Sequence, residues 1–251
     1  MSAERSDDQR SSISVVLPCR NEARNLEILL PRLPEGLGEV VVVDSGCSDD
    51  TVEVARRLRP DARIVTAPAP GKGRALQAGF AAATGEHLVA LDADGSNDPA
   101  EIDPLVAALV AGADLAKGSR YLPGGGSSDA TAVRSFGNRA LCLLFNRRHG
   151  AHLTDLCYGY VAFRREHREL LLDGCDGFDV EARLQANACR AGLRIAEVPS
   201  FEAERVHGTS NLRPGPRRHP HRPGDRRRAR GGAVTSPVTR GAPSRSRPRW
   251  C

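Results

Sequence analysis

The chain has few aromatic residues and no apolar run of the length found in membrane proteins. Phe, Trp and Tyr make up 4% of its 251 residues, whereas hydrophobic residues as a whole make up an ordinary 40%. No window approaches the roughly 18 consecutive apolar residues that a membrane-spanning helix needs. The polar segment 1–12 lacks the apolar core of a secretory signal, and we expect it to be disordered. We therefore expect a globular protein that stays in the cytoplasm.

Cysteine occurs seven times, and the spacing excludes two common uses of it. The number is odd and no CxxC pair is present, which argues against a disulfide framework and against a zinc site. We interpret most of the cysteines as small buried side chains in a reducing compartment.

Positive charge is concentrated at the C-terminal end. Residues 213–251 contain twelve Arg, no Lys and one acid, a net charge of +11, whereas residues 1–212 carry 24 basic and 30 acidic side chains, a net charge of −6. Arg, Pro, Gly and Ser dominate the segment and no periodicity is left, so we predict a disordered basic tail. One interpretation is that its arginines bind nucleic acid or anionic lipid. Another is an out-of-frame translation of GC-rich DNA, which resequencing the 3′ end of the gene would test.

Apolar, β-branched segments alternate with segments of helical periodicity in the first half of the chain. Strands are expected at 13–18, 39–44, 62–68, 87–94 and 113–121, and helices at 21–33, 48–59, 71–85 and 99–112. This alternation predicts an α/β fold with a Rossmann-like, mostly parallel sheet and helices on both faces. The second half is less regular. It is expected to hold a loop at 122–132, helices at 133–150 and 179–192, a strand or hairpin at 154–166, and a strand at 193–205.

Two carboxylates, Asp92 and Asp94, directly follow the buried strand that ends in LVALDAD. Without a positive partner they would repel each other and lose hydration energy. The carboxyl ends of parallel strands meet at one edge of a sheet, so Glu22 and Asp44 are expected nearby. Oxygen ligands of this kind suit Mg²⁺ or Mn²⁺, which takes its remaining ligands from substrate phosphates. We therefore predict a divalent cation that binds with a diphosphate. The plainer alternative is that Asp92 caps the next helix or pairs with an arginine.

Several segments, in order, resemble the family 2 glycosyltransferases of the GT-A fold, near the dolichyl- or polyprenyl-phosphate sugar synthases. The segments are VVLPCRNEARNL, VVVVDSGCSDDT, GKGRALQAG, ALDADGSNDP, KGSRY, TDLCYGYVAF, FDVE and EVPSFEAERVHGTSNL. They cover roughly residues 13–212. Two positions depart from the family pattern: Ser45 replaces the second acid of an Asp pair, and Arg20 precedes Asn21 where an apolar residue or tyrosine is usual.

The resemblance implies one GT-A domain over 13–212, with a nucleotide-sugar half at 13–121 and an acceptor half at 122–212. The residues implied to bind the nucleotide-sugar are Pro18, Asn21, Glu22, Asp44, Lys72, Asp92, Ala93 and Asp94. Asp92 and Asp94 would hold Mg²⁺ or Mn²⁺ on the diphosphate of a UDP- or GDP-linked donor. Arg205 would meet the diphosphate, with Ser210 nearby. Arg120, Arg134 and Asn138 would bind the acceptor.

The implied reaction is inverting sugar transfer to a lipid phosphate or to a hydroxyl. A phosphate acceptor needs no base, whereas a hydroxyl needs a carboxylate to take its proton. The candidates are Asp155, which we group with Asp94 and Arg205 as catalytic, and Asp179 and Glu181. The last two would not share a helix face, and Asp179 is equally explained as an N-cap. A polyprenyl phosphate would be met at the inner face of the membrane, and a soluble acceptor is equally open.

Two other functions fit parts of the sequence. A sugar-nucleotide nucleotidylyltransferase shares the sheet type and the acidic metal site, but it has a Gly- and Arg-rich loop where this chain has PCRNEARN. An Arg-tailed nucleic-acid-binding protein would use residues 213–251. That segment has no folded motif and no interleaved aromatic residues, so we expect no specific nucleic-acid partner.

Overall fold

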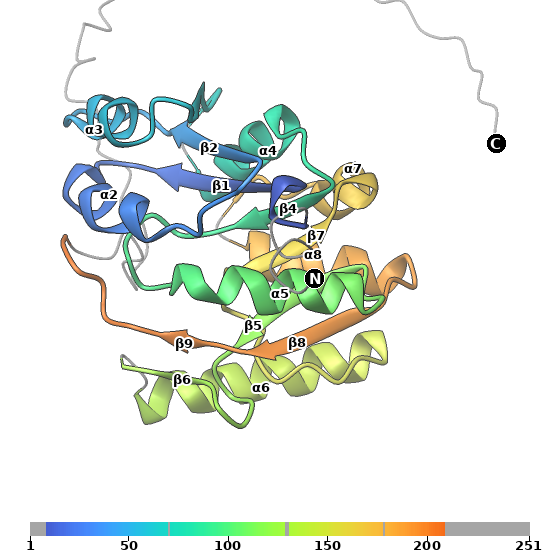
Figure 1. Ribbon diagram of the computed structural model, residues 1–251. Helices are drawn as coiled ribbons and strands as arrows, with labels where there is room; N and C mark the ends of the chain where they lie inside the picture. Colours follow the sequence, from blue (N-terminus) through green and yellow to red (C-terminus); the bar gives the residue numbers. More distant parts are fainter. Residues whose placement is uncertain (1–8, 70, 129–130, 178, 209–251) are drawn as a thin grey trace, which may run out of the picture. The chain divides into compact units, whose positions relative to one another are not determined.

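The computed structural model describes residues 9–69, 71–128, 131–177 and 179–208 (Figure 1). The predicted disordered tail, 213–251, lies outside these residues. Ordered structure begins before residue 13, because residues 9–11 are helical and Arg10 Nε donates to Asp103 Oδ1 at 3.1 Å. The prediction of disorder over 1–12 is therefore wrong for its last four residues.

One sheet of seven strands runs through the domain. In spatial order its strands are β3 (Arg63–Thr66), β2 (Glu39–Asp44), β1 (Ile13–Cys19), β4 (His87–Ala90), β7 (Val161–Arg164), β5 (Leu115–Ser119) and β8 (Ile195–Pro199). All neighbours are parallel except β7, which lies antiparallel between β4 and β5. A small second sheet pairs β6 (Gly126–Ser127) with β9 (Phe201–Glu202). The predicted α/β fold with a mostly parallel sheet is confirmed.

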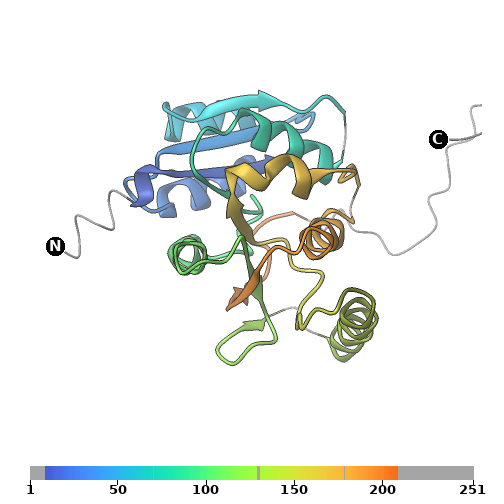
Figure 2. The ribbon, with the colours of Figure 1, turned by 90° about the vertical axis from the view of Figure 1, so that its right-hand side faces the viewer.

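Helices cover both faces of this sheet, as the strand composition requires (Figures 1 and 2). In β2, Val40 and Val42 pack into one apolar cluster, and Val41 and Val43 pack into the other. The first cluster includes residues of α2 (Ala23–Leu29), η1 (Leu30–Arg32), α3 (Thr51–Leu58) and α5 (Ile102–Val110), which follows η2 (Pro99–Glu101). The second includes residues of α4 (Lys72–Ala82), α7 (Arg168–Leu172), which follows η3 (Arg165–His167), and α8 (Val180–Arg190).

Helix α6 (Ala132–His149) lies outside these two layers and packs against α8 (Figures 1 and 2). Its inner face contributes Cys142 to a small apolar cluster with Leu153 and Leu156. The helix ends at Gly150, whose φ of 65° is left-handed and suits glycine at this position. Within the described ranges, no helix has both the length and the apolarity needed to cross a bilayer.

Candidate functional site

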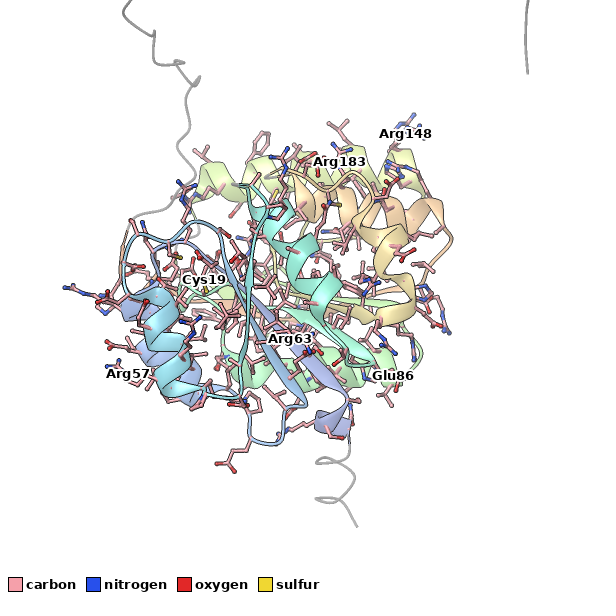
Figure 3. The ribbon with its side chains drawn as sticks, turned by 90° about the horizontal axis from the view of Figure 1, so that it is seen from above. Cys19, Arg57, Arg63, Glu86, Arg148 and Arg183 are labelled. Carbon is pink, nitrogen blue, oxygen red and sulfur yellow. The ribbon has the colours of Figure 1, made fainter. Side chains whose placement is uncertain are left out.

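Asp92 and Asp94 lie in a tight turn just after β4, at the carboxyl ends of the parallel strands β1, β2 and β4. We call this edge the carboxyl rim; Cys19, labelled in Figure 3, is the last residue of β1 there. The strand ends at Ala90, four residues before the predicted boundary, because Asp92 N donates to Asn97 Oδ1 (3.1 Å). Asp94 Oδ1 accepts from Ser96 N (3.0 Å) and from Ser96 Oγ (2.6 Å). The turn therefore fixes the backbone of Asp92 and the carboxylate of Asp94 before any ligand binds.

Lys72 places a positive charge directly on Asp92. Its Nζ lies 2.8 Å from Asp92 Oδ1 and 2.8 Å from Glu181 Oε1, so the first residue of α4 joins the β4 turn to α8. Burial lowers the pKa of this ammonium, but the two carboxylates outweigh burial and hold its pKa above the ordinary value. The lysine is therefore charged at neutral pH. Glu181, expected only as a possible base, is a partner of Lys72.

Gly159 closes this cluster from the side of β7. A Cβ at this position would lie 2.7 Å from Lys72 Nζ and 3.0 Å from Glu181 Oε1. These distances are shorter than normal contacts, so any side chain here would displace the ion pairs. Gly159 is not predicted as a site residue from the sequence, although a glycine between two tyrosines in the CYGYVAF segment indicates a position with little space.

Arg205 forms an ion pair with Asp94, as Lys72 does with Asp92. Its Nη2 lies 2.8 Å from Asp94 Oδ2, and its Nη1 donates to Glu22 Oε1 at 3.0 Å. Burial raises the pKa of Glu22, and hydrogen bonds from Asn25 and Arg205 counteract part of that rise. Asn25 also accepts from His207 N at 3.0 Å, which fastens the segment carrying Arg205 to α2. The arginine thus bridges Glu22 and Asp94, two of the predicted donor-binding residues.

Asp44, Asn21 and Pro18 shape the ends of β1 and β2. Asp44 Oδ1 accepts from Gly46 N (2.9 Å) and Cys47 N (2.8 Å), and these backbone donors lower the pKa of its carboxyl. Asn21 has a left-handed φ of 58°, and its Oδ1 accepts from the backbone N of residue 48 at 2.7 Å. Pro18 lies within β1 and is half-buried. Their predicted contacts with the donor remain predictions.

Arg120 and Asp155 form a second ionic group, after β5. Arg120 donates from Nε and Nη2 to the two oxygens of Asp155, at 2.7 and 2.9 Å, and from Nη1 to Glu202 at 2.9 Å. Asp155 is fully buried. Burial alone would raise the pKa of this carboxyl, but the hydrogen bonds from Arg120 and the charge of Lys117 lower it below the ordinary value. Both oxygens of Asp155 are therefore engaged by a cation.

The two predicted acceptor residues on α6 differ in their surroundings. Asn138 is buried, donates to Thr154 O (3.0 Å) and accepts from Leu156 N (3.1 Å), so it ties α6 to the segment that carries Asp155. Arg134 is exposed in the first turn of the helix. Their roles toward an acceptor remain predictions.

The remaining base candidate, Asp179, lies on the surface. It precedes the first residue of α8 but makes no side-chain cap, and its Oδ2 lies 2.6 Å from Arg183 Nη2. Asp179 thus occupies the N-cap position of α8, as one interpretation predicted, but its side chain makes no capping hydrogen bond. Ser210 lies outside the described residues.

The carboxylate oxygens at the carboxyl rim suit a divalent cation that takes its remaining ligands from a substrate. Among the described residues, no group of three or more His, Cys, Asp or Glu side chains is arranged to hold a metal ion alone. Asp92 and Asp94 offer two carboxylates from one turn, and Mg²⁺ commonly takes one or two carboxylates and fills its other positions with phosphate oxygens. The alternative of a plain ion pair for Asp92 is also realised, with Lys72 in place of an arginine.

Several known proteins resemble this chain in sequence or in fold. A polyprenol monophosphomannose synthase of Mycolicibacterium smegmatis is 36% identical over 218 residues, which cover 79% of this chain and 80% of that one. An undecaprenyl-phosphate mannosyltransferase of Micrococcus luteus is 32% identical, covering 80% of this chain and 87% of that one. The crystal structure of glucosyl-3-phosphoglycerate synthase from Mycobacterium tuberculosis with Mn²⁺, UDP-glucose and phosphoglyceric acid matches with a TM-score of 0.64 and 28% identity, covering 82% of this chain and 75% of that one.

The α/β sheet is that of a GT-A glycosyltransferase. The chain belongs to glycosyl transferase family 2, whose profile matches residues 14–171. It is thus an enzyme that transfers a sugar from a nucleotide-sugar. This membership decides against the nucleotidylyltransferase alternative.

Proposed function

We propose that the protein transfers a sugar from a UDP- or GDP-linked donor to the phosphate of a polyprenyl phosphate, with inversion at the anomeric carbon. The observation that carries this proposal is the pairing of Asp92 with Lys72 and of Asp94 with Arg205 on the carboxyl rim. Two acids and two cations on one edge of a parallel sheet suit a ligand that brings both a diphosphate and a dication. Two relatives named for polyprenyl or undecaprenyl phosphate support the acceptor.

Asp92 and Asp94 would hold Mg²⁺ or Mn²⁺ against the donor's diphosphate. When bound, the ion supplies charge neutralisation for the departing nucleoside diphosphate. Arg205 would leave Asp94 for the diphosphate while keeping Glu22 as its anchor. Lys72 lies on the other side of the same turn and would carry positive charge to the same phosphates. Both cations are held before the reaction, which lowers the reorganisation needed when negative charge develops on the leaving group.

The acceptor's phosphate oxygen would attack the anomeric carbon from the face opposite the donor's diphosphate. The new carbon–oxygen bond forms as the bond to the nucleoside diphosphate breaks, and its electron pair leaves with that group. A phosphate oxygen at neutral pH is already deprotonated, so no protein base is required. This fits Asp155, a buried carboxylate that Arg120 holds ionised with both oxygens engaged. We assign Asp155 the role of positioning Arg120, which would meet the acceptor's phosphate together with Arg134 and Asn138.

A second candidate acceptor is a small phosphorylated molecule. The solved relative with phosphoglyceric acid and UDP-glucose favours it, because the two chains share the fold at a TM-score of 0.64. An acceptor of either kind would bring its phosphate to the same arginines, but one that takes the sugar on a hydroxyl would also need a base.

Transfer assays with a panel of acceptors test the proposal. The enzyme is incubated with Mn²⁺ and each of several UDP- and GDP-sugars, with polyprenyl phosphate in detergent or with phosphoglyceric acid, and products are identified by mass spectrometry. We expect a glycosylated polyprenyl phosphate, lost in Asp94→Ala and retained in Asp173→Ala, an exposed control. Glycosylation of phosphoglyceric acid alone would overturn the lipid acceptor. No transfer to any phosphate acceptor would overturn the proposal.

A further inference from the structure

Helix α6 has a second apolar face, which points away from the protein. Among its exposed side chains are Val133 (81% exposed), Phe136 (75%), Leu143 (69%) and Leu144 (66%). At 3.6 residues per turn these four positions fall within an arc of about 100°, opposite the buried Cys142. The inner face already accounts for the packing of α6 on α8. A soluble helix normally needs only one apolar stripe, so the outer stripe requires another explanation.

The charges on α6 all have one sign. The helix contains Arg134, Arg139, Arg147 and Arg148 and no acid. By helical position, Arg139 flanks the outer stripe on one side, Arg148 flanks it on the other, and Arg147 ends it in the last turn. Figure 3 shows Arg148 pointing outward from the end of this helix. An exposed apolar stripe between arginines is the pattern of a helix that lies in the interface of an anionic membrane.

We propose that the outer stripe of α6, Val133, Phe136, Leu143 and Leu144 with Arg139 and Arg148, seats the enzyme on an anionic phospholipid surface. Charge excludes the two other simple occupants. A second copy of α6 would bring arginines against arginines, and the segment 213–251, with twelve arginines and one acid, has the same sign. The inference rests on the proposed lipid acceptor and deepens it, because α6 also carries Arg134 and Asn138. Binding of this stripe to the bilayer would bring the first turn of α6, which carries the exposed Arg134, close to the lipid headgroups.

Sedimentation with lipid vesicles tests this surface in the full-length protein. The vesicles are phosphatidylcholine alone, or phosphatidylcholine with phosphatidylglycerol. We expect binding to the anionic vesicles, weakened at least tenfold in the double variant Phe136→Ser with Leu144→Ser. Each of Arg139→Gln and Arg148→Gln should weaken it by about fivefold. The controls are Val110→Ser and Arg57→Gln, exposed side chains on α5 and α3 that should leave binding unchanged.

The arginines of residues 213–251 also attract anionic lipid, so only the difference between variants that share this segment is interpreted. Equal binding by the stripe variants and the controls would overturn the inference. The inference would also be overturned if a stripe variant still bound vesicles but sedimented, without lipid, as a monomer where the unmodified protein sediments as a dimer. The stripe would then be a dimer interface. Each variant is also checked for stabilisation by the nucleotide-sugar with Mn²⁺. In the unmodified protein, donor binding without vesicle binding would refute the membrane surface alone, whereas the absence of any donor binding would refute the proposed function.

Discussion

Gly159 lies against the ion pairs of Lys72, and the space there admits no side chain. We predict that Gly159→Ala reduces affinity for the nucleotide-sugar by at least tenfold, because the new methyl group would displace Lys72 or Glu181. Isothermal titration calorimetry with the donor and Mn²⁺ measures this. The matched control is Gly137→Ala on α6, where a Cβ would meet nothing within 4 Å. That variant should bind normally and gain about 0.5–1 kcal/mol of stability. Equal donor affinity in both variants would show that the cluster does not contact the donor.

Asp155 and Asp179 are both paired with arginines, but only Asp155 is buried. We predict that Asp155→Ala lowers the free energy of unfolding by about 3 kcal/mol, because it leaves Arg120 with Glu202 alone in a desolvated setting. Asp179→Ala should lower it by less than about 0.5 kcal/mol, since its partner is an exposed neighbour on the same helix. Urea denaturation measures both values. Similar decreases in the free energy of unfolding in the two variants would contradict the claim that the buried pair of Asp155 and Arg120 stabilises the fold.

At this scale, sequence reasoning could find single chemical groups but not their partners. Asp92 and Asp94 could be predicted because a buried strand ends in them, and Lys72 because glycines flank it. The pairing of Lys72 with Glu181 could not, because α4 and α8 are far apart in the sequence and only tertiary packing brings their first turns together.

Among the elements, strand β5 and the segment before β7 are joined by buried charges, and this makes their stability pH-dependent. The pKa of Asp155 is lower in the folded protein than in the unfolded chain. Its contribution to stability is therefore complete above its unfolded pKa, near 4, and is lost as the pH falls through the lower folded value. We predict that the difference in unfolding free energy between the unmodified protein and Asp155→Asn shrinks below about pH 4. Urea titrations over a pH series check this, and a difference that is constant down to pH 2 would contradict it.

The strands and the longer helices can be predicted from the composition of their segments. The direction of a strand within the sheet and the short helices cannot. The β-branched runs of β1 and β2 identify two buried strands, and the alternation with helices indicates a parallel sheet. The segment of β7 was expected as a strand or hairpin, but nothing in VAFR encodes its antiparallel placement between β4 and β5. Helix α7 has five residues, too few to show a helical period.

For the whole molecule, the two apolar clusters that hold the sheet and its helices lie entirely within residues 13–198. We predict that truncation after Leu212 leaves the midpoint of thermal unfolding and the affinity for the nucleotide-sugar unchanged. The same truncation should abolish any salt-sensitive binding to DNA, because it removes twelve arginines. Thermal unfolding and DNA titrations of both forms check these outcomes. A truncated protein that no longer folds would show that the last 39 residues belong to the core.

The central claim is that Asp92 and Asp94 form one end of a site completed by a dication and a nucleoside diphosphate. Its most direct test is the thermal shift produced by UDP- and GDP-sugars, each with and without Mn²⁺, in the unmodified protein and in Asp94→Ala. We predict that one of these donors raises the unfolding temperature only when Mn²⁺ is present, and that Asp94→Ala loses this shift. A metal-independent shift, or an equal shift in Asp94→Ala, would contradict the claim.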